Sequence, residues 1–215
     1  MKKFKKVILL VIGFLFLGII SGYFYFIKAF PKVEPVPDLK ISSNPEMLRR
    51  GEYLFNSVLG CADCHSTRDY SKYAGPLVEG TLGKGGFEFN EDFGLPGKFY
   101  ARNITPSDLG NWTDGEIFRA ITEGVDKNGN ALFPLMPYIN FGQMDRDDIY
   151  SVIAYLRTLK PLENSIPESK PSFPMNLIMR TIPKKSDFHK KPAESNTIEY
   201  GKYLVIAAGC NDCHT

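Results

Sequence analysis

Two copies of the pentapeptide Cys-x-x-Cys-His constrain this chain more than any other feature. They stand at residues 61–65 and 210–214, and they use all four cysteines and two of the three histidines. A structural zinc site would need four ligands from two neighbouring pairs, whereas these pairs lie far apart in the chain. A dithiol redox site has no need of a histidine after its second cysteine. Neither alternative explains why the same five positions occur twice.

The pentapeptide is the attachment signature of c-type haem. Its two thiols add to the two vinyl groups of one porphyrin, and the histidine that follows supplies the proximal iron ligand. The spacing suits this chemistry because a short loop must reach both edges of the ring while the next side chain points at its centre. We therefore expect two covalently bound haem c groups. The expected attachment and ligand residues are Cys61, Cys64, His65, Cys210, Cys213 and His214.

The N-terminus has the pattern of a transmembrane anchor. Four lysines lie within residues 1–6, and the run Val7–Ile27 carries no charge. As a helix this run is about 30 Å long, which matches the hydrocarbon core of a bilayer. A cleaved signal peptide is the alternative, but its apolar core is shorter and small residues mark its cleavage site. The excess of lysine before the run predicts a cytoplasmic N-terminus and a periplasmic remainder.

Caps and apolar periodicity predict three helices in the part of the chain around the first motif. Asparagine, threonine or aspartate begins each one, because a short polar side chain accepts hydrogen bonds from the free amides of the first turn. Glycine or proline ends each one. The predicted helices run from Asn44 to Gly60, from Thr113 to Gly124 and from Asp145 to Pro161.

The second axial ligand of the first iron is expected to be a methionine. His189, the one histidine outside the motifs, lies in a charged stretch and is expected at the surface. Met144 directly precedes a helix cap, where a packing role suffices. Met136 lies in a loop stiffened by Pro134 and Pro137, which can hold a thioether at a fixed height over the ring. The alternative role for Met136 is to fill a gap in the core; we expect it to be the distal ligand.

These motifs together resemble class I cytochrome c: a helix, Cys-x-x-Cys-His, Gly75-Pro76, a methionine loop and a terminal amphipathic helix. The resemblance implies a mostly α haem domain. It also implies that the backbone carbonyl of Pro76 accepts a hydrogen bond from Nδ1 of His65, which would fix the imidazole. In addition, it implies that Gly51 and Tyr155 meet where the first and last helices cross.

Residues 103–106, 111–116 and 132–138 are more similar still to the multi-haem cytochrome c subunits of membrane-bound periplasmic dehydrogenases. This resemblance implies electron transfer from a periplasmic dehydrogenase or another redox donor to a respiratory-chain acceptor. Those subunits often carry three haem motifs, and two are visible here. A di-haem oxidoreductase of the peroxidase kind, with an open iron site at the second haem, is the alternative. The net charge of +2 gives no reason to expect nucleic acid as a partner.

The chain also contains an interrupted repeat. Residues 200–204 and Gly209-Cys210 repeat residues 50–54 and Gly60-Cys61, and we expect the chain to be the N-terminal portion of a longer protein with a truncated second haem domain. The linker before the repeat is rich in proline, and its apolar patch at residues 173–179 is expected to pack along the first domain. The expected domains are an anchor (1–30), a spacer (31–43), haem domain 1 (44–160), a Pro-rich linker (161–195) and the start of haem domain 2 (196–215).

Overall fold

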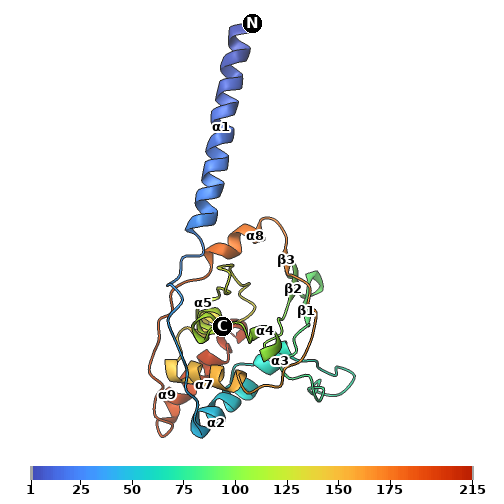
Figure 1. Cartoon of the computed structure of the whole chain (residues 1–215), viewed down its shortest axis with the longest axis vertical. Coiled ribbons are helices and arrows are strands. Elements are labelled where there is room, and N and C mark those ends of the chain that lie inside the picture. Colours follow the sequence, from blue (N-terminus) through green and yellow to red (C-terminus); the bar gives the residue numbers. More distant parts are fainter. Residues whose placement is uncertain (1, 215) are drawn as a thin grey trace.

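A long helix projects from a rounded body in this computed structural model, which describes residues 2–214 (Figure 1). The helix is α1 (Lys2–Ala29), and its part from Lys3 to Ala29 is long and apolar enough to cross a membrane. None of its most apolar window is buried against the body. The predicted N-terminal helix is therefore confirmed, although some signal sequences are also long and apolar enough to meet this criterion.

The body is mostly α, as the sequence predicted. Its longer helices are α2, α5, α7 and α9, and the rest are single turns. The bounds are α2 (Pro45–Tyr53), the π-helical turn η1 (Leu54–Val58), α3 (Cys61–His65), α4 (Pro106–Leu109), α5 (Asp114–Glu123), α6 (Tyr138–Phe141), α7 (Arg146–Leu156), α8 (Met175–Ile178), α9 (Thr197–Ala207) and α10 (Asn211–His214), with 3-10 turns η2 (Glu91–Phe93) and η3 (Met179–Thr181).

The three predicted helix starts are confirmed by their caps. The side chain of Asn44 accepts a hydrogen bond from the amide of Met47 at 2.9 Å. Thr113 and Glu116 form a reciprocal capping box at the start of α5. Asp145 caps α7. These starts were predictable because each cap uses only residues within one turn of the helix that it begins.

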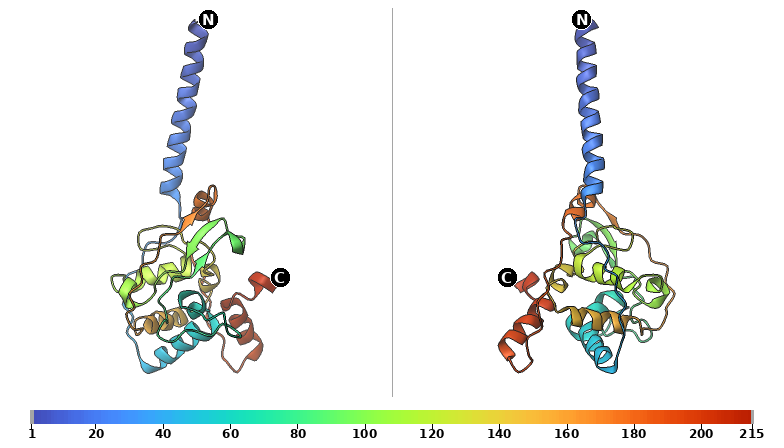
Figure 2. Two further views of the ribbon diagram at one scale, coloured as in Figure 1. Left: turned by 90° about the vertical axis from the view of Figure 1, so that its right-hand side faces the viewer. Right: turned by 60° about the vertical axis from the view of Figure 1, so that its left-hand side comes forward.

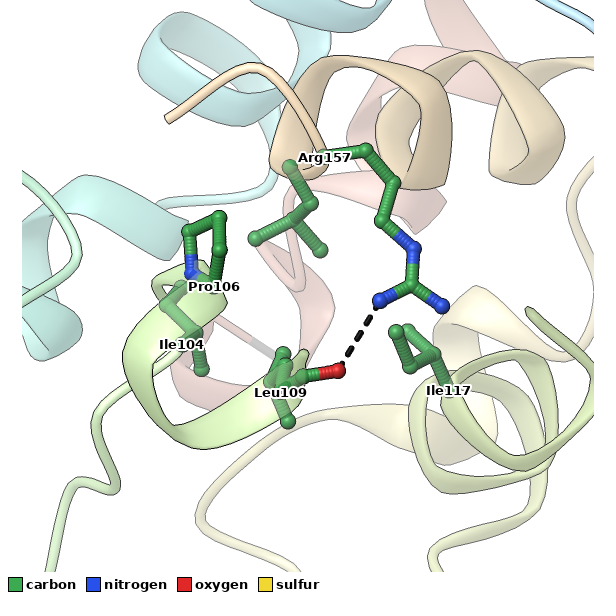
Figure 3. A pocket seen from close by; sticks show the side chains of 6 residues that line it. Ile104, Pro106, Leu109, Ile117 and Arg157 are labelled. Atoms are coloured by element: carbon green, nitrogen blue, oxygen red, sulfur yellow. Dashed lines mark hydrogen bonds between the residues drawn. The ribbon is translucent and has the colours of Figure 1, made fainter. Parts of the chain in front are cut away.

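The predicted end of the third helix is wrong, because α7 stops at Leu156 and not at Pro161. Its C-cap residue, Arg157, turns its guanidinium away from the carbonyls of α7. The guanidinium instead donates to the Asp114 carboxylate at 2.8 and 3.0 Å. It also donates to the Leu109 carbonyl at 2.9 Å, the bond drawn in Figure 3. The void beside this bond has a volume of about 10 Å³. It has room for about one water molecule, so it is a packing gap between α4, α5 and α7.

α2 crosses α7 at Gly51, as the resemblance implied. A Cβ atom at this position would lie 1.9 Å from the Ser151 carbonyl oxygen and 2.9 Å from Cβ of Tyr155. Only glycine permits so close an approach of two helices. This crossing forms the base of the hydrophobic core. The buried core side chains are Leu54, Phe55, Leu59, Ala62, Ile117, Phe118, Phe141, Met144, Ile149, Val152, Ile153, Leu156, Leu159, Tyr203 and Ala207.

A small antiparallel sheet, which the sequence analysis did not predict, covers one side of the body. Its order is β1 (Glu88–Phe89), β2 (Gly97–Tyr100) and β3 (Lys170–Pro171). Tyr100 pairs with Glu88, and Gly97 pairs with Pro171. The linker thus adds the edge strand of this sheet and is part of the body.

The linker packs along the first domain as predicted, except for its apolar patch. Asn103 donates to the Leu162 carbonyl at 2.6 Å, and Arg102 donates to the Pro167 carbonyl at 3.1 Å. In the patch at residues 173–179, however, Phe173 is 80% exposed and Ile178 is 47% exposed, while Met179 is buried. The expected packing therefore holds for Met179 and fails for Phe173 and Ile178. The patch lies where α1 joins the body, at the α8 label of Figure 1.

The spacer also contacts the body. The amide of Ile41 donates to the Asp114 carboxylate at 2.8 Å. A Cβ atom on Gly115 would lie 1.9 Å from the Pro37 carbonyl oxygen, so the spacer runs directly over the start of α5. The first domain is consequently held close to α1.

Candidate haem sites

The first motif forms one helical turn, α3, that begins shortly after the end of η1. Gly60 separates the two with a φ of 64°, in the left-handed region that favours glycine. This single residue redirects the chain, so that the motif is presented as a compact turn. Cys61 and Cys64 are partly buried free thiols, and Ala62 between them belongs to the core. Arg68 pairs with the Asp63 carboxylate and donates to the Ala74 carbonyl, which fastens the loop that follows to the motif.

His65 is oriented by a backbone carbonyl, but not by the one that the resemblance implied. Its Nδ1 lies 2.6 Å from the carbonyl oxygen of Arg102. The Pro76 carbonyl instead accepts a hydrogen bond from the amide of Asp69 at 2.9 Å. The implied role of Pro76 is therefore wrong in this structure. Because a carbonyl can only accept, Nδ1 carries the hydrogen and Nε2 keeps the lone pair that a metal needs.

The Arg102 carbonyl is itself held from two sides. Gly85 packs so closely that a Cβ atom would lie 2.5 Å from that oxygen, and its amide donates to the His65 carbonyl at 2.8 Å. The next residue, Asn103, is buried and bonds to Thr105 and to the Leu162 carbonyl. Sequence reasoning missed Arg102, although it directly precedes the stretch 103–106 that carried the resemblance.

Burial sets the protonation of the motif. It raises the pKa of the Cys61 thiol to about 12, and the neighbouring Cys64 adds to this shift. Burial also raises the pKa of Cys64, with a further contribution from the Asp63 carboxylate. Burial lowers the pKa of His65. Near neutral pH the motif therefore presents two thiols and a neutral imidazole, which is the form of histidine that binds iron.

Met136 lies in the loop before α6, on the border of the hydrophobic core. Both Met136 and Cys61 are partly buried against this same cluster. The loop is fixed on either side: the amide of Leu132 donates to the Gly124 carbonyl at 2.7 Å, and the ring of Tyr138 packs under Gly124. Met144 is 1% exposed within the cluster, which confirms its packing role. The assignment of Met136 as an iron ligand stays a prediction.

The second motif repeats the local backbone of the first. Gly209 precedes it with a φ of 67°, close to the 64° of Gly60, and α10 forms a single turn like α3. The Asp212 carboxylate accepts a hydrogen bond from Asn140 of α6 at 2.9 Å. Cys210 and His214 are exposed, whereas the side chain of Cys213 lies outside the described part of the structure. The second motif thus sits against the helix that follows the Met136 loop.

A polar cluster fastens α9 to the first domain. Arg50 of α2 makes two hydrogen bonds to the Asp148 carboxylate of α7, at 2.9 and 2.7 Å, and donates to the Tyr200 hydroxyl at 2.9 Å. The Tyr203 hydroxyl donates to Asp148 at 2.6 Å and accepts from the amide of Asp145 at 3.2 Å. Burial and the Asp148 carboxylate raise the pKa of Tyr203, so its hydroxyl stays a donor. We call these residues the α9 clasp; sequence reasoning did not identify it.

Two further findings bear on metal binding. His189 is exposed, as predicted, and lies 3.8 Å from the Asp187 carboxylate. Among the residues that the structure describes, no three or more His, Cys, Asp or Glu side chains gather around a possible metal position. The donor set of the first site is instead two thiols and one oriented imidazole on a single turn. That set fits a covalently attached haem.

Comparison with known proteins gives several relatives that are named cytochrome c subunits of dehydrogenases. No family model matches the chain. It is 30% identical to the cytochrome c subunit of a quinone-dependent alcohol dehydrogenase from Gluconacetobacter polyoxogenes, over 79% of this chain and 36% of the relative. It is 28% identical to the gluconate 2-dehydrogenase cytochrome c subunit of Pantoea cypripedii, over 80% of this chain and 39% of the relative.

A shorter relative, a diheme c-type cytochrome from Cereibacter sphaeroides, is 27% identical over 81% of this chain and 62% of its own length. The chain therefore spans well under half the length of the two dehydrogenase subunits that it matches. These cytochrome c relatives imply that the chain binds haem.

Proposed function

Since this chain is related to the cytochrome c subunits of dehydrogenases, we propose that it carries electrons through covalently bound haem c outside the cytoplasm, tethered to the membrane by α1. The proposal keeps the division into an anchor, a spacer, a first haem domain, a linker and the start of a second haem domain.

The observation that carries this proposal is the bond between His65 and the Arg102 carbonyl at the end of the Cys-x-x-Cys turn. It leaves the lone pair of His65 Nε2 available to bind a metal, on the same turn as the two thiols. A haem attached there supplies a one-electron iron couple. The protein contributes the attachment points, a fixed imidazole tautomer and an apolar wall made by Leu59, Ala62 and their core neighbours.

Met136 is proposed as the opposite ligand. Its loop is braced at Leu132 and at Tyr138, so the thioether is held by a stiff segment at the edge of the core. With His65 and Met136 both donating, the protein leaves no coordination position for a substrate. Such a site suits electron transfer better than catalysis.

The second motif is proposed as the next electron-transfer site. Asp212 in the motif is bonded to Asn140, and the α9 clasp fastens the helix before the motif to α2 and α7. The protein therefore holds the two attachment turns on one body, which favours exchange between them. By analogy with its relatives, the chain would receive electrons from a periplasmic dehydrogenase and pass them to a respiratory-chain acceptor.

Two pairs of variants test the attachment. Cys61→Ala with Cys64→Ala should remove one haem, and Cys210→Ala with Cys213→Ala should remove the other. The measurements are haem staining after a denaturing gel and the intact mass, because only covalent haem survives denaturation. Each pair acts as the control for the other, and an unchanged mass in either pair would contradict attachment at that motif.

Carbon monoxide separates a carrier from the peroxidase-like alternative. Reduced haem at a His65/Met136 site should not bind carbon monoxide, since both axial positions are taken. If the second site turns over hydrogen peroxide catalytically, the peroxidase-like function holds for that site. A chain that binds no carbon monoxide and has no peroxidase activity supports electron transfer alone.

A further inference from the structure

The apolar patch of the linker, residues 173–179, is an exposed apolar feature that the proposed function leaves unused. It has no charged residue, and its exposed members are Phe173 and Ile178. Basic residues flank it on both sides at Lys170 and Arg180. No acidic residue occurs between Glu168 and Asp187. An uncharged apolar segment between basic flanks has the composition of a membrane-interface segment.

The patch is fastened directly to the end of α1. Arg180 donates to the carbonyl of Ile27 at 3.0 Å and to that of Phe30 at 2.7 Å. These are carbonyls at or just beyond the last turn of α1, which have no partner within the helix. The guanidinium therefore caps α1, and α8 and η3 stand beside the point where α1 leaves the body in both views of Figure 2.

We propose that this patch contacts the surface of the bilayer that α1 crosses, with Phe173 and Ile178 in the interfacial layer. The inference rests on α1 being a retained anchor, as proposed above. Because Arg180 bonds to Ile27, the last residue of the uncharged run, the patch lies at the depth where that run meets the headgroups. Tyr23 and Tyr25 of α1 lie within a turn or so of this level, which is the usual place of an aromatic belt.

Continuity with α1 favours lipid over a protein as the occupant. Any partner on this patch would have to fit between the body and the bilayer, since Arg180 holds the patch at the end of the anchor. If α1 crosses the bilayer, lipid surrounds this point. With α1 as one contact and the patch as a second, the body could not rotate freely about the anchor, and the haem sites would keep one face toward the membrane.

Photocrosslinking in the full-length holoprotein, in native membranes, tests this contact. Phe173→p-benzoylphenylalanine places the probe on the patch. Ile198→p-benzoylphenylalanine is the matched control, because Ile198 is also 80% exposed but lies on α9, at the end of the body far from α1 (Figure 1). Membranes are irradiated and washed with alkaline carbonate, and peptides are then analysed by mass spectrometry for the added mass of one phospholipid.

The expected result is a phospholipid adduct at position 173, its absence at position 198, and retention of both variants in the carbonate pellet. A pelleted protein without the adduct at 173, or with equal adducts at both positions, overturns the inference while leaving the anchor intact. An adduct of 173 to another protein also overturns it and assigns the patch to a protein partner. Release of the protein by carbonate overturns the anchor as well, so the two failures are distinguishable.

Discussion

Two methionines flank α6, and their different burial predicts different consequences of substitution. Met136, before the helix, is partly buried at the edge of the core; Met144, after it, is fully buried. If Met136 ligates the iron, Met136→Ala should abolish the Met–iron charge-transfer band of the oxidised protein and lower the reduction potential, because a thioether ligand favours the ferrous state. The absorption spectrum and a redox titration measure both effects.

Met144→Ala is the control for this experiment. It should keep the band and the potential but lower the free energy of unfolding by about 2–5 kcal/mol, since it leaves a cavity in the core. Loss of the band in Met144→Ala, with retention in Met136→Ala, would show that the ligand has been assigned to the wrong methionine.

Asp145 gives the molecule a pH-dependent contribution to stability. Burial alone would raise its pKa, but hydrogen bonds from the amides of Lys191 and Asp147, and the charge of Lys190, lower it below the ordinary value. The unfolded chain takes up the proton near pH 4, above the folded pKa. The stabilisation is therefore fully present above about pH 4 and is lost as the pH falls through the folded pKa.

Asp145→Asn tests this, because asparagine still caps α7 but cannot ionise. At pH 7 the free energy of unfolding of the variant should be about 1 kcal/mol lower than that of the parent protein. The difference should shrink as the pH is lowered below about 4, where first the unfolded chain and then, at a lower pH, the folded parent takes up the proton. Denaturant unfolding at several pH values measures it, and a difference that stays constant down to pH 2 would contradict the ionic contribution.

At the level of elements, the internal repeat offers a matched pair of glycines. Gly51 of α2 faces the Ser151 carbonyl across the helix crossing, whereas a Cβ atom on Gly201 of α9 would meet nothing within 4 Å. Gly51→Ala must force α2 and α7 apart and should lower the free energy of unfolding by about 3 kcal/mol. Gly201→Ala should raise stability by about 0.5 kcal/mol, because alanine loses less entropy than glycine in a helix.

Thermal unfolding of the two variants measures both effects, the expected loss of stability in Gly51→Ala and the expected gain in Gly201→Ala. Equal destabilisation by both substitutions would mean that α9 is packed at Gly201 in the way that α2 is packed at Gly51. That result would contradict the open face of α9 in this structure.

The same elements show what could be learned from the sequence. Helix starts at Asn44, Thr113 and Asp145 were predictable because their signals are local. The end of α7 was not, because Arg157 bonds to Asp114, a residue far from it in the chain. The partner of His65 was also missed, since the choice between two backbone carbonyls depends on how residues 83–103 fold back over the motif. No local pattern marks strands as short as β1 and β3.

At the level of the whole molecule, the α9 clasp joins the second motif to the first domain. Tyr203→Phe removes the hydroxyl that donates to Asp148 and accepts from the amide of Asp145. It should lower the free energy of unfolding by about 2 kcal/mol, because it leaves buried polar groups without this partner. Tyr200→Phe removes one bond to Arg50, whose guanidinium keeps Asp148, and should cost less than about 1 kcal/mol. Hydrogen exchange of the α9 amides should accelerate clearly in the first variant and little in the second. Equal exchange in the two would contradict the central place of Tyr203.

The orientation of the whole chain follows from the charges around α1. Four lysines precede the uncharged run of the helix, and two, Lys28 and Lys32, follow it closely in the sequence. The excess at the start favours a cytoplasmic N-terminus, so we expect both Cys-x-x-Cys-His turns to lie in the periplasm. With an epitope tag before Lys2, protease added to spheroplasts should digest the body and leave a tagged fragment of about the size of α1. Digestion of the tag while the body stays intact would show the opposite topology, with the N-terminus outside the cytoplasm. A mature N-terminus found beyond Ile27 would instead show that the helix is a signal sequence removed on export, because the apolar run that can cross the membrane would then be gone.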